Sequence, residues 1–292
     1  MKIEKTIKDS IANWIASHSE FLNESSLRGL SNLVNKDFFS IPRIDPIHEL
    51  KSSGICKSCN KSGISFNEFE YSFIDWGLSI LKERPSPNIK YDQAPVTSDQ
   101  AFHNIAYIIS NISNEKSFAF LGDDDFHSLL LAKLLPNLSI TVFEADKRIG
   151  SKIEELARTH SLNVSVVEIN IINNIPSKYH CQFDSFYTDP PYSKKGIFLF
   201  LYNGLSLLRD KRTSWGILAI PFTSLPLQVK ELIIEIQLYL TQNGILIDEV
   251  IPFFKKSPSE LGIISGILRF QLIRKKSISI PSMDGGLYDH FY

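Results

Sequence analysis

Cysteine, excess charge and long apolar runs are all scarce in this 292-residue sequence. The three cysteines are too few for a disulfide framework and favour a reducing compartment. The net charge of -1 gives no overall positive field, so we expect no nucleic acid partner without a local basic patch. No run is long enough to span a bilayer, and Met1 to Lys5 lack the apolar core of a signal peptide. These absences predict a cytoplasmic protein without a membrane partner.

Two of the cysteines, Cys56 and Cys59, have the spacing of half a zinc site. A structural zinc needs about four ligands, and His48 is the single further candidate nearby. Ligation shared across a dimer stays open as an alternative. We predict two free thiols on a hairpin and no bound metal.

The first 82 residues have the outline of a winged helix. Apolar side chains recur there at helical spacing, and a stretch rich in glycine and serine over 52–64 is typical of a hairpin. The candidate recognition helix, 42–50, has Arg43 as its single cation, which is poor material for reading DNA. We therefore expect a structural or dimerising domain over 1–82, with a homodimer as one outcome, followed by a proline-punctuated linker over 83–100.

Residues 101–276 alternate between apolar and amphipathic segments, a pattern that predicts an α/β fold with a doubly wound parallel sheet. The expected strands are 118–121, 139–143, 164–169, 185–188, 215–220, 245–251 and 262–273. The last two follow each other closely, which predicts an antiparallel pair at the sheet edge. Seven strands in this order are typical of the Rossmann domain of S-adenosylmethionine-dependent methyltransferases and aminopropyltransferases. We expect the polar stretch 277–292 to be a flexible tail.

Three adjacent carboxylates, Asp123, Asp124 and Asp125, follow Gly122 at the end of the first of these strands. Ligands of open α/β sheets bind beyond the carboxyl ends of the strands, so we expect this turn to lie at the site. Adjacent acids repel one another, and burial of any of them requires a cationic or hydrogen-bonded partner.

Two further strand ends carry polar side chains suited to a nucleoside. Glu144 follows the second strand, where an acid usually accepts hydrogen bonds from ribose hydroxyls, and Asp146 is the second choice for that role. Asn170 follows the third strand, where its side-chain oxygen could accept a hydrogen bond from an adenine amino group.

The fourth strand ends in Asp189, Pro190, Pro191 and Tyr192, the most specific local signal in the chain. The prolines fix the backbone and leave carbonyl groups without partners. A carboxylate and such a carbonyl, here those of Asp189 and Pro190, could accept two N–H bonds from an amine and stabilise the charge that develops on its nitrogen. The aromatic ring of Tyr192 offers a flat face for a base or a cation.

The same tetrapeptide occurs in DNA and RNA amino-methyltransferases, which gives one interpretation of the site. Those enzymes usually have a glycine pair after the first strand, whereas three acids follow Gly122 here. The carboxylate of S-adenosylmethionine would be repelled by these acids. Decarboxylated S-adenosylmethionine, which ends in an ammonium group, would be attracted to them.

The chain resembles the branched-chain polyamine synthases, or N4-bis(aminopropyl)spermidine synthases. The segments that carry the resemblance are Arg84 to Pro87, Tyr91 to Gln93, Thr97, Leu121 to Asp125, Phe183 to Asp184 and Thr188 to Pro191. The resemblance implies aminopropyl transfer from decarboxylated S-adenosylmethionine to an amine such as spermidine, with Asp92 and Gln93 among the substrate-binding residues. It also implies that the aspartate run holds the polyamine and supplies the catalytic acid or base.

Two positions depart from the pattern of that family. Tyr192 and Asn170 stand where acidic residues are usual, so a less cationic or an aromatic amine remains an alternative acceptor. We expect one of the three adjacent aspartates to accept the amine proton, and Asp189 to aim the nucleophile. Two other functions stay open: an S-adenosylmethionine-dependent amino-methyltransferase, and a winged-helix regulator whose Rossmann-like domain senses a polyamine.

Overall fold

A computed structural model describes residues 66–221, 227–256, 264–274 and 286–287 of the chain. The expected winged helix and its cysteine pair lie outside the described residues, apart from the last part of the 1–82 region. The described residues divide into two compact units, which are treated separately. The first unit takes 66–83, 98–114 and 133–135, and the second takes the remainder.

The first unit contains the helices α5 (Phe66–Lys82) and α6 (Ser98–Ser110). Their contact is apolar, because the rings of Phe73 and Phe102 meet edge to face at 5.9 Å between centroids. The helix α6 is buried along most of its length, including Ile105. A helix that is apolar on nearly all sides is stable only inside a packed core.

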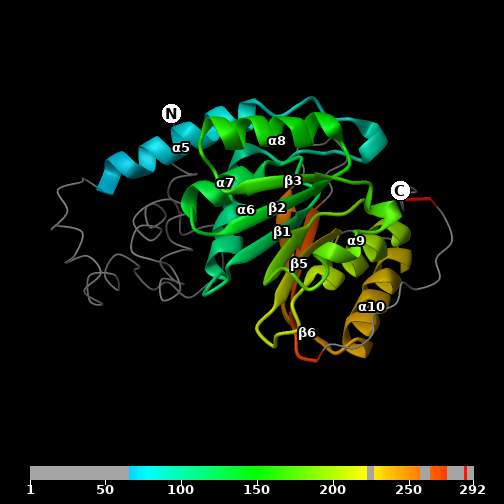
Figure 1. Cartoon of the computed structure of the whole chain (residues 1–292). Helices are drawn as coiled ribbons and strands as arrows, with labels where there is room; N and C mark the ends of the chain where they lie inside the picture. The colour runs from blue at the N-terminus through cyan, green and yellow to red at the C-terminus, as the bar shows by residue number, and fades with distance from the viewer. Residues whose placement is uncertain (1–65, 222–226, 257–263, 275–285, 288–292) are drawn as a thin grey trace. The chain divides into compact units, whose positions relative to one another are not determined.

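The second unit is an α/β sheet whose described strands have the order β3-β2-β1-β4-β5-β7-β6. Its strands are β1 (Ser117–Leu121), β2 (Ser139–Glu144), β3 (Val164–Glu168), β4 (Ser185–Thr188), β5 (Trp215–Pro221), β6 (Ile245–Lys256) and β7 (Ile264–Leu272). Its helical elements are η2 (Ile89–Tyr91), most of α7 (His127–Leu134), α8 (Lys147–Thr159), η3 (Ile171–Asn173), η4 (Ser177–Tyr179), α9 (Lys194–Leu207) and α10 (Leu227–Gln242). The first five strands are parallel, and β7 pairs antiparallel with both β5 and β6 (Figure 1). The predicted Rossmann-like sheet with antiparallel strands at one edge is confirmed.

Apolar packing on both faces explains the strand sequences. All five residues of β1 are buried, as expected of a central strand in a parallel sheet. The helices α9 and α10 lie side by side on the sheet, where Phe198 and Tyr239 meet edge to face (Figure 1). Close approach of α9 to β4 requires Gly204, because a Cβ atom there would lie 2.3 Å from the ring of Phe186.

The sheet topology places one strand end between two others. Strand β1 pairs with β2 on one side and with β4 on the other, and Leu121 is in register with both Phe143 and Thr188. The chain therefore leaves β1 and β4 toward opposite halves of the sheet, which creates a crevice beyond their carboxyl ends. The residues that follow these strands lie along this crevice.

Within the described residues, the predicted strand bounds agree with the observed ones to within one residue, except at the end of β6. The helix α7 begins at His127, because Phe126 has a left-handed backbone (φ 58°) and its N–H donates to the carbonyl of Asp123. Strand β6 continues to Lys256, beyond the predicted end at Ile251. Across the described ranges, no helix combines the length and apolar character needed to cross a membrane.

Candidate active site

An open pocket of about 580 Å³, part of it solvent, lies at the carboxyl ends of the central strands. The residues that line it are Tyr91, Asp92, Gln93, Gly122, Asp123, Asp124, Phe143, Glu144, Ala145, Ile169, Asn170, Ile171, Asp189, Pro191, Phe200 and Leu287. Most of the predicted site residues are therefore brought together in one place. Asp125, Asp146, Pro190 and Tyr192 are not among the described residues that line this pocket.

The charged residues that line the pocket are all acidic among the described residues. The lining includes five carboxylates, those of Asp92, Asp123, Asp124, Glu144 and Asp189, and no lysine or arginine among its described members. Apolar side chains make up much of the remaining wall. A ligand with a positive charge and an apolar or aromatic body matches both properties.

Asp123 and Glu144 are buried and bonded to backbone amides. The oxygens of Asp123 accept from the N–H groups of His127 at 2.8 Å and Ser128 at 3.0 Å. Glu144 accepts the N–H of Asp123 at 3.0 Å and those of Ala145 and Asp146, each at 2.8 Å. Burial raises the pKa of Glu144, and it raises the pKa of Asp123 well above its ordinary value, despite these hydrogen bonds. Both groups would be further stabilised as carboxylates by a nearby cation.

Asp125 contacts a different part of the chain from Asp123. Its Oδ1 accepts the N–H of Val96 at 2.7 Å and lies 3.5 Å from Nη1 of Arg84. Its Oδ2 lies 4.0 Å from Nε2 of His127, and the side chain is 5% exposed. Arg84 in turn donates to the carbonyl of Val96 at 3.0 Å. These contacts connect Asp125 to the two ends of the segment 84–97.

Asp124 and Asp189 both line the pocket from the two sides of the central crevice, at the ends of β1 and β4. The hydroxyl of Tyr192 donates to Oδ1 of Asp189 at 3.0 Å. Pro190, the next residue in the chain, is buried, and Pro191 lines the pocket. Tyr192 therefore orients a pocket carboxylate through its hydroxyl.

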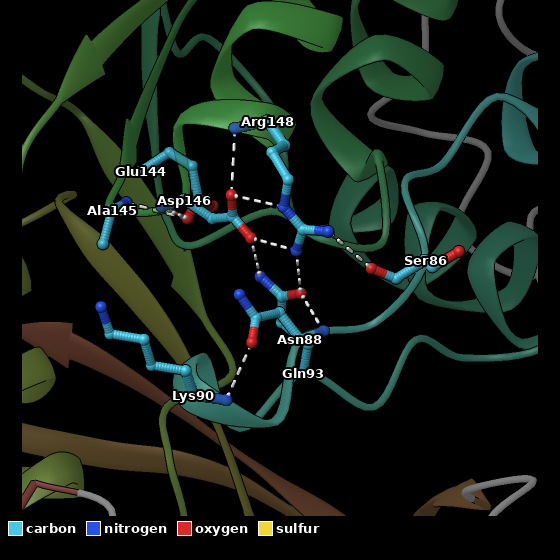
Figure 2. Close-up of polar contacts among 8 residues, drawn as sticks. All are labelled: Ser86, Asn88, Lys90, Gln93, Glu144, Ala145, Asp146 and Arg148. Carbon is cyan, nitrogen blue, oxygen red and sulfur yellow. Dashed lines mark hydrogen bonds and ion pairs between the residues drawn. The ribbon is translucent and has the colours of Figure 1, made fainter.

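Asp146 and Gln93 bind each other across 53 residues of sequence, as Figure 2 shows. The Nε2 group of Gln93 donates to Oδ2 of Asp146 at 2.9 Å, and Arg148 binds both oxygens of the same carboxylate. Burial alone would raise the pKa of Asp146, but the hydrogen bonds from Arg148 and Gln93 outweigh it and lower the pKa. The adjoining Asp92 lines the pocket and has a left-handed backbone with φ 57°.

Several residues that line the pocket cannot be recognised as site residues from the sequence alone. Phe143 ends β2, Phe200 lies on α9, and Ile169 and Ile171 flank Asn170, whose side chain also accepts the N–H of Ile172. A buried apolar residue in a strand or helix is indistinguishable in sequence from core. Leu287, within the stretch predicted to be flexible, is 7% exposed and its carbonyl accepts the Ser193 hydroxyl at 2.5 Å.

Comparison of the sequence with known proteins identifies relatives of this chain. The family model described as the branched-chain polyamine synthase A C-terminal domain matches residues 75–276. An N(4)-bis(aminopropyl)spermidine synthase of Methanocaldococcus jannaschii is 32% identical over 167 residues, which are 56% of this chain and 47% of that protein. The chain spans about half the length of the first curated relatives that it matches.

Comparison with solved structures gives the same fold. The C9 mutein of the branched-chain polyamine synthase from Thermus thermophilus, in complex with N4-aminopropylspermidine and 5′-methylthioadenosine, has a TM-score of 0.66 and 23% identity. The match covers 74% of this chain and 68% of that one. A putative RNA methyltransferase from Pyrococcus horikoshii has a TM-score of 0.50, with 69% and 98% of the two chains covered and 16% identity. The likeness establishes a methyltransferase-like Rossmann fold.

Proposed function

The chain belongs to the branched-chain polyamine synthase family, and from that premise we propose that it is an aminopropyltransferase. The donor would be decarboxylated S-adenosylmethionine, and the acceptor an amine, with a polyamine such as spermidine as the first choice. The observation that carries this proposal is the charge of the pocket, whose five carboxylates have no lysine or arginine beside them among the described lining residues.

The charge of the pocket favours this donor over its parent compound. Decarboxylated S-adenosylmethionine has a sulfonium and an ammonium group, both positive, whereas S-adenosylmethionine adds a carboxylate. That carboxylate would have to enter a partly desolvated site already containing Asp124, Glu144 and Asp189. Like charges in such a site disfavour the carboxylate, and the ammonium group is attracted instead.

The nucleoside part of the donor matches the β2 and β3 side of the pocket. Glu144 lies at the end of β2 and is our candidate for the ribose hydroxyls, and Phe143 and Ile171 supply apolar surface for a base. Asn170 lines the same wall as the candidate partner of the adenine amino group. Gly122, with φ 73° and no side chain, lets the backbone of the first turn approach the ligand.

The reaction is a direct displacement at carbon. The lone pair of a neutral amine attacks the methylene carbon beside the sulfonium, the new C–N bond forms, and the C–S bond breaks. The bonding electrons go to sulfur, so 5′-methylthioadenosine leaves as a neutral thioether, and the amine nitrogen then loses its proton. Catalysis would come mainly from orientation of the two reactants and from carboxylates near the developing charge on nitrogen.

Asp124 is our choice for the carboxylate that accepts this proton. Asp123 and Asp124 both line the pocket, but Asp123 is buried with both oxygens accepting backbone N–H groups, whereas Asp124 is partly exposed. Asp125 is buried outside the described lining, where it faces Val96 and Arg84. Asp189, held by Tyr192, and the carbonyl of Pro190 would orient the attacking nitrogen. Since the amine must be neutral to attack, activity should rise toward alkaline pH.

Spermidine as the acceptor is supported by the relatives. Curated relatives from three organisms are N(4)-bis(aminopropyl)spermidine synthases. The Thermus thermophilus structures contain N4-aminopropylspermidine and 5′-methylthioadenosine, a pair that matches product and by-product of this reaction. An amine with two or more positive charges would also suit the acidic pocket.

A transfer assay read by mass spectrometry tests the proposal. The purified chain receives decarboxylated or ordinary S-adenosylmethionine, each with spermidine, other polyamines or aromatic amines. Release of 5′-methylthioadenosine with an acceptor heavier by one or two aminopropyl units is the expected result. A methylated acceptor would instead identify an amino-methyltransferase, and no transfer from either donor would contradict an enzymatic role.

A further inference from the structure

We propose that Asp146, Arg148 and Gln93 form a brace that holds residues 86–93 against the nucleoside pocket, and that they act as positioning residues. The sequence predicts Asp146 as the second choice for the ribose, and the family resemblance implies that Gln93 binds the substrate. Their side-chain contacts support a different role for both. This inference rests on the proposed function, because it concerns the pocket that would receive the donor.

The carboxylate of Asp146 is the centre of the brace (Figure 2). Its Oδ1 accepts the backbone N–H of Arg148 at 3.0 Å and Nε of the same residue at 3.1 Å. Its Oδ2 accepts Nη2 of Arg148 at 2.6 Å and Nε2 of Gln93 at 2.9 Å. The guanidinium group binds in the two-pronged geometry that lysine cannot reproduce. These four hydrogen bonds occupy the acceptor sites of Asp146, which lies outside the described pocket lining. Glu144 accepts three and lines the pocket, so the ribose role stays with Glu144.

Arg148 and Gln93 extend the brace to a backbone segment about sixty residues earlier. The Nη1 group of Arg148 donates to the carbonyl of Ser86 at 3.2 Å. The Oε1 atom of Gln93 accepts the N–H of Asn88 at 2.8 Å and lies 3.5 Å from Nη2 of Arg148. One carboxylate is thereby connected to two points on the backbone, Ser86 and Asn88.

The segment held in this way forms one wall of the pocket. The side chain of Asn88 caps the start of η2 by accepting the N–H of Lys90 at 3.1 Å. Asp92 caps its other end with a left-handed backbone. Aspartate adopts this left-handed conformation more readily than most residues other than glycine, which suits it to the end of the turn. Tyr91, the last residue of η2, and Asp92 both line the pocket.

The other end of the brace reaches Glu144 in the pocket lining. The backbone N–H of Asp146 donates to Oε1 of Glu144 at 2.8 Å. Glu144 lines the pocket, and its Oε2 accepts the N–H of Asp123 in the turn after β1. The brace therefore fixes the distance between the 86–93 segment and the carboxylate placed for the ribose. Loss of the brace should weaken donor binding before it affects the displacement itself.

The test uses the full chain with Arg148→Ala, Arg148→Lys and a matched control, Arg158→Ala, on the exposed last turn of the same helix. Two readouts apply: hydrogen exchange at the amides of Asn88, Lys90, Tyr91 and Asp92, and the Kd for 5′-methylthioadenosine by calorimetry. We expect Arg148→Ala to speed this exchange and raise the Kd about ten-fold, as a wall displaced by a fraction of an ångström would do. The donor KM should rise in parallel, while kcat changes less than about three-fold.

Each result supports or overturns the brace. Unchanged exchange and Kd in Arg148→Ala would overturn it, and so would full recovery in Arg148→Lys, which keeps the charge without the fork. An equal effect in Arg158→Ala would also overturn it, because the cause would then be general destabilisation of α8. If the unaltered chain does not bind 5′-methylthioadenosine, the proposed function fails, while the exchange data still decide on the brace.

Discussion

At the scale of single residues, the turn after β1 shows how three adjacent acids can coexist. Their carboxylates leave the backbone in three directions: to the first amides of α7, to the pocket, and to Val96 with Arg84. Separation lowers the repulsion among them, and the amides and the guanidinium group compensate two of the charges. Asp123 and Asp124 line the pocket, and Asp124 is the more exposed of the two.

The substitutions Asp124→Asn and Asp125→Asn should separate a catalytic from a structural role. We expect Asp124→Asn to lower kcat about 100-fold, because a positioned proton acceptor is lost, with the unfolding midpoint unchanged. Asp125→Asn should lower the free energy of unfolding by about 2 kcal/mol, because it loses the charge that faces Arg84. Urea unfolding and the transfer assay measure the two effects. Equal activity losses in two equally stable variants would contradict these separate roles.

Tyr192→Phe tests the residue that departs from the family pattern. The substitution removes the hydroxyl that donates to Asp189 and leaves the ring in place. We expect the KM for the amine to rise about five-fold, which corresponds to the loss of one hydrogen bond that orients the carboxylate. The Kd for 5′-methylthioadenosine should stay the same, since our proposal assigns Asp189 to the acceptor. A change in nucleoside binding alone would reverse that assignment.

At the scale of the elements, the sequence pattern predicts best those features that depend on neighbouring residues alone. The apolar run 118–121 is correctly predicted as a buried strand, and Glu144 at the end of β2 is predicted to lie at the crevice. The partners of these acids cannot be predicted from the sequence. Asp146 and Gln93 meet because η2 returns to the start of α8, and such a return depends on tertiary packing that no periodicity encodes.

Two glycines in helices should respond oppositely to replacement by alanine. In α9, Gly204→Ala would place a Cβ 2.3 Å from the ring of Phe186, so we expect a loss of about 2 kcal/mol from overpacking. In α8, the added Cβ of Gly150→Ala would lie 3.2 Å from a methyl group of Val166. There the gain in helix propensity, up to about 1 kcal/mol, should offset the crowding. Thermal or urea unfolding compares the pair, and a larger loss for Gly150→Ala would contradict the packing described for the two helices.

At the scale of the whole molecule, the pocket concentrates negative charge in a chain whose net charge is only -1. Burial raises the pKa of Asp123 and Glu144, so the empty folded state holds protons that the unfolded chain would release. These groups therefore stabilise the fold most at low pH, and that contribution is lost as the pH rises through their raised pKa values. A bound cation lowers those pKa values again.

Binding of the cationic donor should consequently release protons. We expect its affinity to increase as the pH rises from about 4.5, the ordinary pKa of a glutamate, through the raised pKa of Glu144. Calorimetry at about pH 5.5 in two buffers of different ionisation enthalpy measures the protons released. The neutral 5′-methylthioadenosine is the matched control and should release none. Equal proton release for both ligands would show that these carboxylates do not respond to the charge of the donor.

The position of β7 has a consequence for synthesis of the chain on the ribosome. In the described sheet, β7 lies between β5 and β6, although it is made after both. Until residue 272 has emerged, β5 exposes an open edge and β6 has no neighbour with which to pair. The parallel part of the sheet, with the first pocket carboxylates, can be made before that moment. The antiparallel edge is completed in one late step, when a single strand closes two gaps at once.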